Sequence, residues 1–340
     1  MAERADSMRR TLAAGGKTMI DRCSRTIDYI RISVTDRCNL RCVYCMPEEG
    51  IVPMSHGDIL TYHEILRICE AGARLGIRKV KVTGGEPLVR KDIEVLIKGL
   101  QSIPGIEDVT MTTNGCLLKE KAALLKAAGL SSVNVSLDTL NPERFAEITR
   151  RDCFESVMEG IESALEAGLK VKINCAVMEE LSKEEVLAFA RFSMERRIPV
   201  RFIEMMPIGQ GKRYKAMEND DLAGILSETF GPLRESREVK GNGPAVYYTW
   251  GNETGFVGFI SAVSHRFCGS CNRVRLTSDG FLKLCLDSPA GVDLKRPLRE
   301  GISDGDLLDL MKQSIQSKPE SHHFEEDNGE ASPNMNQIGG

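Results

Sequence analysis

The sequence contains no long apolar run: no segment approaches the roughly 18 consecutive apolar residues of a membrane-spanning helix. Its first residues, MAERADSMRR, are charged and lack the apolar core of a secretory signal, so we expect no export. Repeats at the periods of solenoid proteins are also missing. These absences favour a globular protein with no membrane partner, and we expect it in the cytoplasm.

The chain also has no excess of positive charge. Its 340 residues include 45 Lys and Arg against 49 Asp and Glu, a formal net charge of −4. We therefore expect no nucleic-acid partner, although a local basic pocket is compatible with this balance. With 41% hydrophobic residues the chain is able to bury a sizeable core, and its length predicts about two domains.

Cysteine, in contrast, is abundant: the 11 cysteines are an odd number, which argues against a disulfide framework. Cys38, Cys42 and Cys45 form a CxxxCxxC motif. Cys268 and Cys271 form a CxxC pair, and Cys285 follows in the same region. The others, which we interpret as small buried apolar residues, are Cys23, Cys69, Cys116, Cys153 and Cys175.

The first two thirds of the chain alternates between strand and helix patterns. Strands are predicted over residues 29–34, 79–83, 108–112, 132–137, 170–177 and 199–203, and helices over 62–75, 91–102, 118–128, 154–167 and 183–196. Such alternation implies parallel strands. The unusual residues follow the C-terminal ends of the strands, where barrels gather their active sites. We therefore predict an α/β fold, a partial (β/α)6 TIM-like barrel over 27–214, rather than a doubly wound sheet.

Beyond the barrel the pattern changes to short runs separated by Gly, Pro and Asn. Strand-like runs over 246–250, 256–260, 273–276 and 281–284, with a helix over 304–315, predict a smaller C-terminal α+β domain over 215–316. Residues 1–26 are interpreted as an N-terminal arm. Residues 317–340, which end in Gly339-Gly340, form a tail that has the composition of a disordered segment.

The spacing of Cys38, Cys42 and Cys45 supplies three thiolates for a metal centre. A structural zinc site requires four protein ligands, and the nearest histidines, His56 and His63, offer no regular fourth position. A four-iron cluster tolerates three cysteines, because its remaining iron accepts a small ligand. The spacing therefore favours a cluster over zinc.

The second cysteine set leaves more alternatives open. CxxC pairs are common zinc ligands, and His265 lies three residues before Cys268, so zinc and an iron–sulfur cluster both fit the spacing. Arg273 and Arg275 follow at alternate positions of a predicted strand and share one face. Two arginines beside a metal centre suit an anionic substrate, since arginine binds phosphate through paired hydrogen bonds.

The segment CNLRCVYC, from Cys38 to Cys45, resembles the signature of the radical S-adenosylmethionine (SAM) enzymes. The run Gly84-Gly85-Glu86-Pro87 resembles the turn that follows the second strand of that family. The resemblance implies a partial (β/α)6 barrel and a [4Fe–4S] cluster whose open iron binds SAM. It also implies contacts with SAM by Tyr44, Gly85, Ser136 and Met206.

In combination, CxxxCxxC, GGEP, CGSCNRVR and the final Gly-Gly make the chain from about residue 27 similar to the GTP 3′,8-cyclases of molybdenum-cofactor biosynthesis. This resemblance implies two [4Fe–4S] clusters, one per cysteine triad, with GTP bound at the second. The implied reaction of this radical SAM lyase forms (8S)-3′,8-cyclo-7,8-dihydroguanosine 5′-triphosphate. The alternatives are a radical SAM enzyme whose auxiliary cluster serves a peptide or sugar substrate, and a zinc-bearing regulatory protein.

The resemblance also implies roles for single residues. Contacts with GTP are implied for Arg31, Lys81, Thr112, Lys172, Arg273, Val274 and Arg275. Catalytic roles are implied for Arg31, Arg273, Arg275, Gly339 and Gly340, the last two entering the active site from the end of the chain. Lys81 stands where the family often has arginine, which keeps the charge but puts a bidentate phosphate contact in doubt.

The implied partners follow from the same family. They are a low-potential electron donor such as flavodoxin or ferredoxin, and the next enzyme of the pathway, cyclic pyranopterin monophosphate synthase, which would receive the product. The resemblance is compatible with a monomer or a homodimer.

Overall fold

The computed structural model describes residues 18–215, 217–238, 241–251, 255–324 and 334–339. Its strands are β1 (Tyr29–Ser33), β2 (Lys79–Thr83), β3 (Asp108–Thr113), β4 (Ser132–Ser136), β5 (Lys170–Val177), β6 (Val200–Glu204), β7 (Arg234–Ser236), β8 (Val246–Thr249), β9 (Phe256–Ile260), β10 (Arg273–Leu276), β11 (Phe281–Lys283) and β12 (Gly291–Asp293). Its helices are α2 (Tyr62–Leu75), α3 (Ile93–Ser102), α4 (Leu118–Ala127), α5 (Pro142–Thr149), α6 (Phe154–Glu166), α7 (Lys183–Arg196), α8 (Asn219–Phe230), α9 (Lys295–Arg299), α10 (Asp304–Gln316) and α11 (Met335–Ile338). Three short 3-10 helices are η1 (Pro87–Val89), η2 (Gly209–Arg213) and η3 (Cys268–Ser270).

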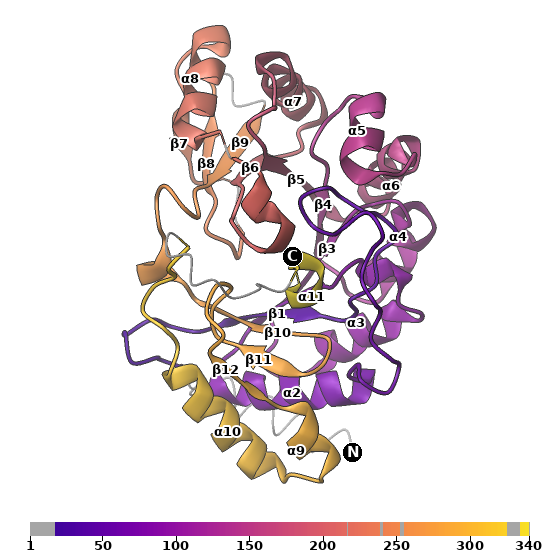
Figure 1. The fold of residues 1–340 in the computed structure, drawn as a ribbon, viewed down its shortest axis with the longest axis vertical. Helices are drawn as coiled ribbons and strands as arrows, with labels where there is room; N and C mark the ends of the chain where they lie inside the picture. Colours follow the sequence, from indigo (N-terminus) through magenta and orange to yellow (C-terminus); the bar gives the residue numbers. More distant parts are fainter. Residues whose placement is uncertain (1–17, 216, 239–240, 252–254, 325–333, 340) are drawn as a thin grey trace.

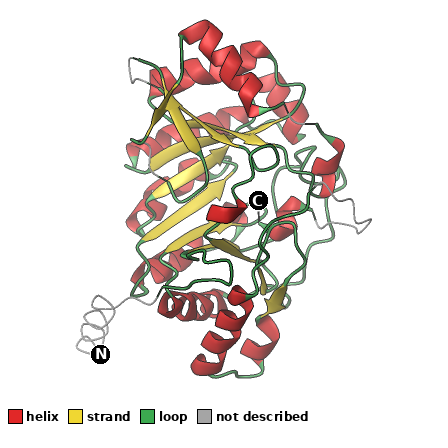
Figure 2. Cartoon of the chain, turned by 90° about the vertical axis from the view of Figure 1, so that its left-hand side faces the viewer, coloured by secondary structure: helices red, strands yellow, loops and turns green. Residues whose placement is uncertain are grey.

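Strands β1 to β6 lie side by side in chain order, each parallel to the next. Helices α2 to α7 cover the outer face of these strands, as Figures 1 and 2 show. Two of the helices begin at capping boxes, in which Thr61 pairs with Glu64 and Ser182 with Glu185. This arrangement confirms the predicted partial (β/α)6 barrel. Among the described residues, no helix has the length and apolar character of a membrane span.

The two faces of the barrel strands differ in chemistry. Val80 and Val82 of β2, like Val133 and Val135 of β4, are fully buried in the apolar core. The alternate positions face the barrel interior and are polar: Arg31, Lys81, Thr83, Thr110, Thr112, Asn134, Ser136, Lys172, Asn174 and Arg201. Closed (β/α)8 barrels fill this interior with branched side chains. Here the polar interior surrounds a cavity instead.

The C-terminal strands extend the barrel sheet at both edges. β10 lies parallel to β1, and β9 lies parallel to β6, so the described strands form one sheet in the order β12-β11-β10-β1-β2-β3-β4-β5-β6-β9-β8-β7. The outer strands continue antiparallel, through β11 to β12 and through β8 to β7. The predicted C-terminal α+β region therefore has no separate sheet of its own, and α10 packs against α2 of the barrel.

The described residues near both ends of the chain make ordered contacts that their composition does not suggest. Of the predicted arm the structure describes residues 18–26, which form an Ile20–Thr26 bridge and an ion pair of 2.7 Å between Asp21 and Arg25. Of the tail that follows α10 it describes residues 317–324 and 334–339. The last of these include α11, which lies in the mouth of the barrel (Figures 1 and 2). Burial against distant parts of the fold orders these polar residues, and local patterning does not report such contacts.

Smaller differences concern single elements. The helix predicted over 91–102 begins at Ile93, after η1, which starts at Pro87. Four of the described helices were not predicted: α5, α8, α9 and α11. α5 begins where Asn141 caps a helix whose first residue is Pro142, a pattern that the sequence does contain.

Candidate active site

A cavity of about 670 Å³ occupies the barrel interior, a size within the range of about 300–1,000 Å³ that ligand pockets have. All six cysteines of the two triads line it. The first triad follows the C-terminal end of β1. The second lies near the opposite end, because Cys271 precedes β10 and β10 is parallel to β1 with Tyr29 opposite Arg273. The cavity therefore connects two separate groups of three thiols.

The first triad lies in a tight, partly buried loop. The Cys45 amide donates to the Cys42 carbonyl at 2.9 Å, and two N–H groups, of Leu40 and Asn114, donate to Cys38 Sγ at 3.4 and 3.8 Å. Burial raises the pKa of Cys38 to about 11 and that of Cys45 to about 12. These thiols need an added positive charge to ionise, which bound iron provides. Three partly buried thiols, one of which accepts two N–H groups at its sulfur, fit a [4Fe–4S] cluster.

The Gly84-Gly85 turn is pressed against the cysteine loop. The Gly85 amide donates to Thr35 O at 2.6 Å, and the Glu86 amide donates to Arg37 O at 2.8 Å. A Cβ on Gly85 would lie 2.3 Å from Arg37 O, and one on Gly84 would lie 2.8 Å from Thr35 O. Only glycine allows this approach of the two backbones, so these glycines set the position of the cysteine loop.

Two buried carboxyl groups, those of Glu86 and Asp138, lie near the first triad. Glu86 accepts hydrogen bonds from the Leu88 and Asn114 amides and the Thr113 hydroxyl, and burial raises its pKa to about 7. Its carboxyl group thus joins the GGE turn to the end of β3.

Asp138, which follows β4, likewise joins separate segments through its carboxyl group. It accepts from the Tyr44 hydroxyl at 2.6 Å and from the Ala176 amide at 2.8 Å, and burial raises its pKa to about 6. Tyr44, the aromatic residue between Cys42 and Cys45, is therefore tied to the ends of β4 and β5 through this carboxyl group.

The second triad lies beside cations. Cys268 begins η3, and the Cys271 amide donates to the Cys268 carbonyl at 3.1 Å. Burial raises the pKa of Cys271, but the nearby charges of Lys318 and Arg273 lower it. The lowering outweighs the effect of burial, so the net shift is downward. A positive surrounding favours thiolates, which bind iron. Three cysteines that line one cavity beside these cations fit a second cluster.

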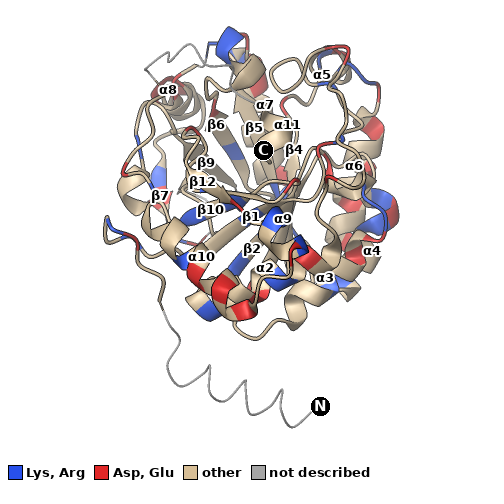
Figure 3. Cartoon of the chain, turned by 60° about the horizontal axis from the view of Figure 1, so that its bottom comes forward, with Lys and Arg blue, Asp and Glu red and all other residues tan. Residues whose placement is uncertain are grey.

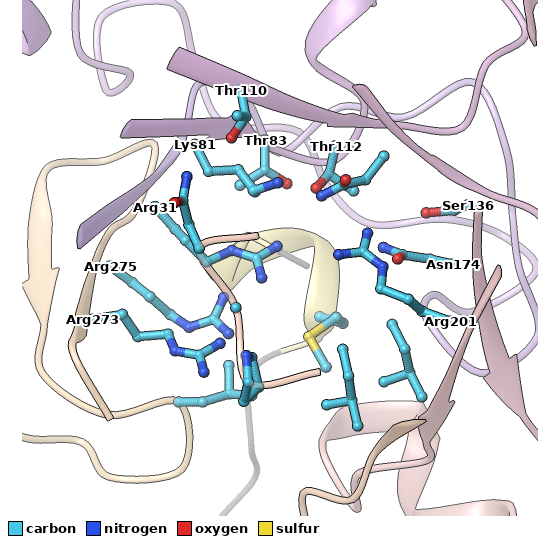
Figure 4. Close-up of a pocket in the computed structure, with 18 of the residues that line it drawn as sticks. Arg31, Lys81, Thr83, Thr110, Thr112, Ser136, Asn174, Arg201, Arg273 and Arg275 are labelled. Carbon is cyan, nitrogen blue, oxygen red and sulfur yellow. The ribbon is translucent and has the colours of Figure 1, made fainter. Parts of the chain in front are cut away.

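A row of cations crosses three neighbouring strands between the triads. Arg31 of β1 lies opposite Arg275 of β10 on one side and opposite Lys81 of β2 on the other. Figure 4 shows the labelled side chains pointing into the cavity, with Arg273 beside Arg275. In Figure 3, Lys and Arg colour the inner strands β1, β2 and β10, whereas the outer helices carry both signs. Burial lowers the pKa of Lys81 well below its ordinary value, and neighbouring cations lower it further.

Two more cations reach the cavity from the other side of the barrel. Arg201 of β6 is buried, and its Nε and Nη2 have no hydrogen-bond partner among the described residues. Lys172 of β5 is half-buried beside the Tyr247 ring, and burial lowers its pKa to about 8. Burial of the two Arg201 nitrogens without partners costs free energy, and a polyanionic ligand would accept hydrogen bonds from them. The arrangement is suited to hold an anion.

The end of the chain reaches the same place. The Asn336 side chain donates to the Asp36 carbonyl at 3.0 Å, and Ile338 is buried. The Gly339 carbonyl accepts from Arg275 Nη1. A Cβ on Gly339 would lie 3.1 Å from Ser33 Cβ, so a larger residue would be crowded there. Gly340 lies outside the described residues.

Comparison with known proteins identifies this arrangement. The model of the "Radical SAM superfamily" matches residues 32–193, and that of "Molybdenum Cofactor Synthesis C" matches residues 198–324. The GTP 3′,8-cyclase of Pelotomaculum thermopropionicum is 47% identical over 326 residues, which cover 95% of this chain and all of that protein. The GTP 3′,8-cyclase of Clostridium perfringens is 44% identical over 323 residues, with the same coverage.

The chain belongs to the GTP 3′,8-cyclase family of radical SAM enzymes.

A solved structure shares the fold of this family member. Streptococcus suis SuiB bound to S-adenosylmethionine superposes with a TM-score of 0.61 at 16% identity, over 91% of this chain and 70% of that one. The cofactors of the radical SAM cyclase family are SAM and two [4Fe–4S] clusters, and the cavity of this chain contains two cysteine triads.

Most of the residues singled out in the sequence line the cavity of this radical SAM fold. Gly339 contacts the lining residue Arg275 but does not itself line the cavity, and Gly340 lies outside the described residues. The exception on β10 is Val274, whose side chain is fully buried in the core, because strand alternation turns it away from Arg273 and Arg275. The cavity includes residues that the sequence analysis missed: Thr83, Thr110, Asn134, Asn174 and Arg201. Arg201 had a signal, since it is the one charged residue among the apolar positions of VRFI at the start of β6.

Proposed function

We propose that this chain binds GTP in the barrel cavity and converts it to (8S)-3′,8-cyclo-7,8-dihydroguanosine 5′-triphosphate. The observation that carries the proposal is the row Arg275, Arg31 and Lys81, which lies between the two cysteine triads. A triphosphate is polyanionic, and enclosed charges interact more strongly than charges screened by salt. The relatives that cover 95% of this chain are named GTP 3′,8-cyclases, which agrees with this chemistry.

The residues divide into a phosphate group and a SAM group. We assign the triphosphate to Arg31, Lys81, Thr112, Lys172, Arg273 and Arg275, with the Val274 backbone between the two arginines, and we add Arg201 on the opposite strand. We assign SAM to the side of the cavity that holds Tyr44, Gly85, Ser136 and Met206. Cys38, Cys42 and Cys45 would hold the first cluster, and Cys268, Cys271 and Cys285 the second. When bound, the clusters and SAM supply the radical chemistry.

The tail has a part in this proposal. Arg275 donates to the Gly339 carbonyl, so the tail orients a guanidinium group that faces the substrate. α11 lies in the mouth of the barrel (Figure 1), where we propose that it helps to exclude water from the reacting groups. We assign catalytic positions to Arg31, Arg273, Arg275 and Gly339, and to Gly340 at the end of the chain.

The remaining assignments concern the cell. All 11 cysteines are free, as expected in a reducing compartment, which supports a cytoplasmic location. We propose a flavodoxin or ferredoxin as the electron donor and cyclic pyranopterin monophosphate synthase as the recipient of the product. A monomer and a homodimer are both compatible with a site built from one chain.

The test is anaerobic reconstitution with iron, sulfide, SAM, reductant and GTP, followed by identification of the product. Arg273→Ala and Arg275→Ala should weaken GTP binding with both clusters retained, because charged hydrogen bonds contribute about 1.5–3 kcal/mol each, or roughly 10- to 150-fold. Arg234→Ala, at an exposed position of β7, is the matched control. Zinc in either triad of the anaerobic protein, or unchanged GTP affinity in both cavity variants, would contradict the proposal.

A further inference from the structure

Arg25 connects three segments that are far apart in the sequence. Its side chain is buried, and Nη1 donates to the Cys268 carbonyl at 3.0 Å. Further hydrogen bonds reach the carbonyl groups of residues 318–320, at 2.6–3.4 Å. Nε donates to Asp21 Oδ2 at 2.7 Å. One guanidinium group therefore joins the N-terminal segment, the loop of the second triad and the segment that follows α10.

Lys318 holds the other end of the second triad. It is only 2% exposed, and its Nζ donates to the Leu284 carbonyl, directly before Cys285. Its own backbone carbonyl accepts from Arg25. The two buried cations thus contact the chain at the first and just before the last cysteine of the triad. A hydrogen bond from Arg25 to the Lys318 carbonyl links the two cations.

The charges around the two cations do not cancel. Asp21 pairs with Arg25, and its Oδ1 accepts from the Cys23 and Arg25 amides at 2.9 Å each. Lys318 and the remaining Arg25 donors bind neutral carbonyl groups of the described residues. Arg25, Lys318 and Asp21 together carry one positive charge, which adds to that of Arg273 beside the second triad.

We propose that Arg25 and Lys318 are positioning residues of the second cluster: they hold the Cys268 and Leu284 carbonyl groups and place one uncompensated positive charge beside the thiolates. Groups beyond the ligands orient a metal site and tune its potential, through hydrogen bonds and net charge. The inference rests on the assignment of the second triad to a cluster. It does not depend on the identity of the substrate.

The experiment separates the two clusters by background variants. With Cys42→Ser all bound iron belongs to the second triad, and with Cys271→Ser all of it belongs to the first. Arg25→Gln should lower the iron content at least twofold in the first background and leave it unchanged in the second. Arg22→Gln is the control, because Arg22 is exposed and also donates to a carbonyl, that of Gln316 at 3.2 Å.

The reduction potential distinguishes positioning from a general role in folding. Removal of a positive charge disfavours the reduced cluster, so Arg25→Gln and Lys318→Gln should lower the potential measured by redox titration with electron paramagnetic resonance. Arg25→Lys should restore most of the potential, since it keeps the charge. Equal iron loss in both backgrounds, or an unchanged potential in both Gln variants, would overturn the inference. If Arg25→Gln does not fold, Lys318→Gln and Arg25→Lys decide the question by the same two measurements.

Discussion

The contact at Gly85 leads to a sharp prediction for Gly85→Ala. The added methyl carbon would lie 2.3 Å from Arg37 O and 2.7 Å from Asp36 O, distances that real side chains do not show. Both of these oxygens are backbone atoms, so no side-chain rotation relieves the clash. The cysteine loop must therefore move, and Cys38 is the residue that follows Arg37.

The size of the effect follows from the packing. Overpacking of this kind costs about 1–3 kcal/mol. At about 1.4 kcal/mol per tenfold, we expect SAM affinity at the first triad to fall roughly 5- to 150-fold. The second triad lies near the opposite end of β1, so its iron content should not change.

The measurements are SAM affinity in the reconstituted enzyme and iron content in the Cys42→Ser and Cys271→Ser backgrounds. Gly224→Ala is the matched control, because Gly224 lies within α8 and an added Cβ meets no atom within 4 Å. An alanine in a helix interior should stabilise the fold by about 0.5–1 kcal/mol. Wild-type SAM affinity in Gly85→Ala would refute the argument that two backbones must meet there.

Three further predictions concern other parts of the cavity. Burial, and after it the charge of Arg201, lowers the pKa of Lys172 to about 8. A bound triphosphate favours the charged form, so binding takes up a proton above pH 8. Calorimetry should show the Kd for GTP rising up to tenfold per pH unit there, and Lys172→Arg should lack this slope. Cys42→Ser should keep about half the iron and lose SAM cleavage; full iron content in metal analysis would contradict one cluster per triad. Deletion of Gly339 and Gly340 should preserve both clusters and SAM binding but stop cyclisation, and product formation at the full-length rate would show that the tail only packs.

Several features of this protein follow from its sequence alone. Alternation of apolar and polar residues predicted β2 and β5 at their observed bounds, because the period of a strand is a local property. The spacing within each cysteine triad is equally local, as is the pairing of Arg273 with Arg275 on one face. The partial barrel followed from the order of strands and helices, since parallel strands require helical crossovers. Roles assigned to single residues stay predictions.

Only the tertiary structure decided how these local pieces meet. It placed β10 beside β1, which brings Arg275 next to Arg31, and it returned α11 to the barrel mouth. It also buried Arg25 against the Cys268 loop, although the composition of its segment indicated an arm. Such contacts join residues hundreds of positions apart. Their stability comes from burial and from the satisfaction of hydrogen-bond donors in the folded chain, and neither is encoded in the periodicity of any one segment.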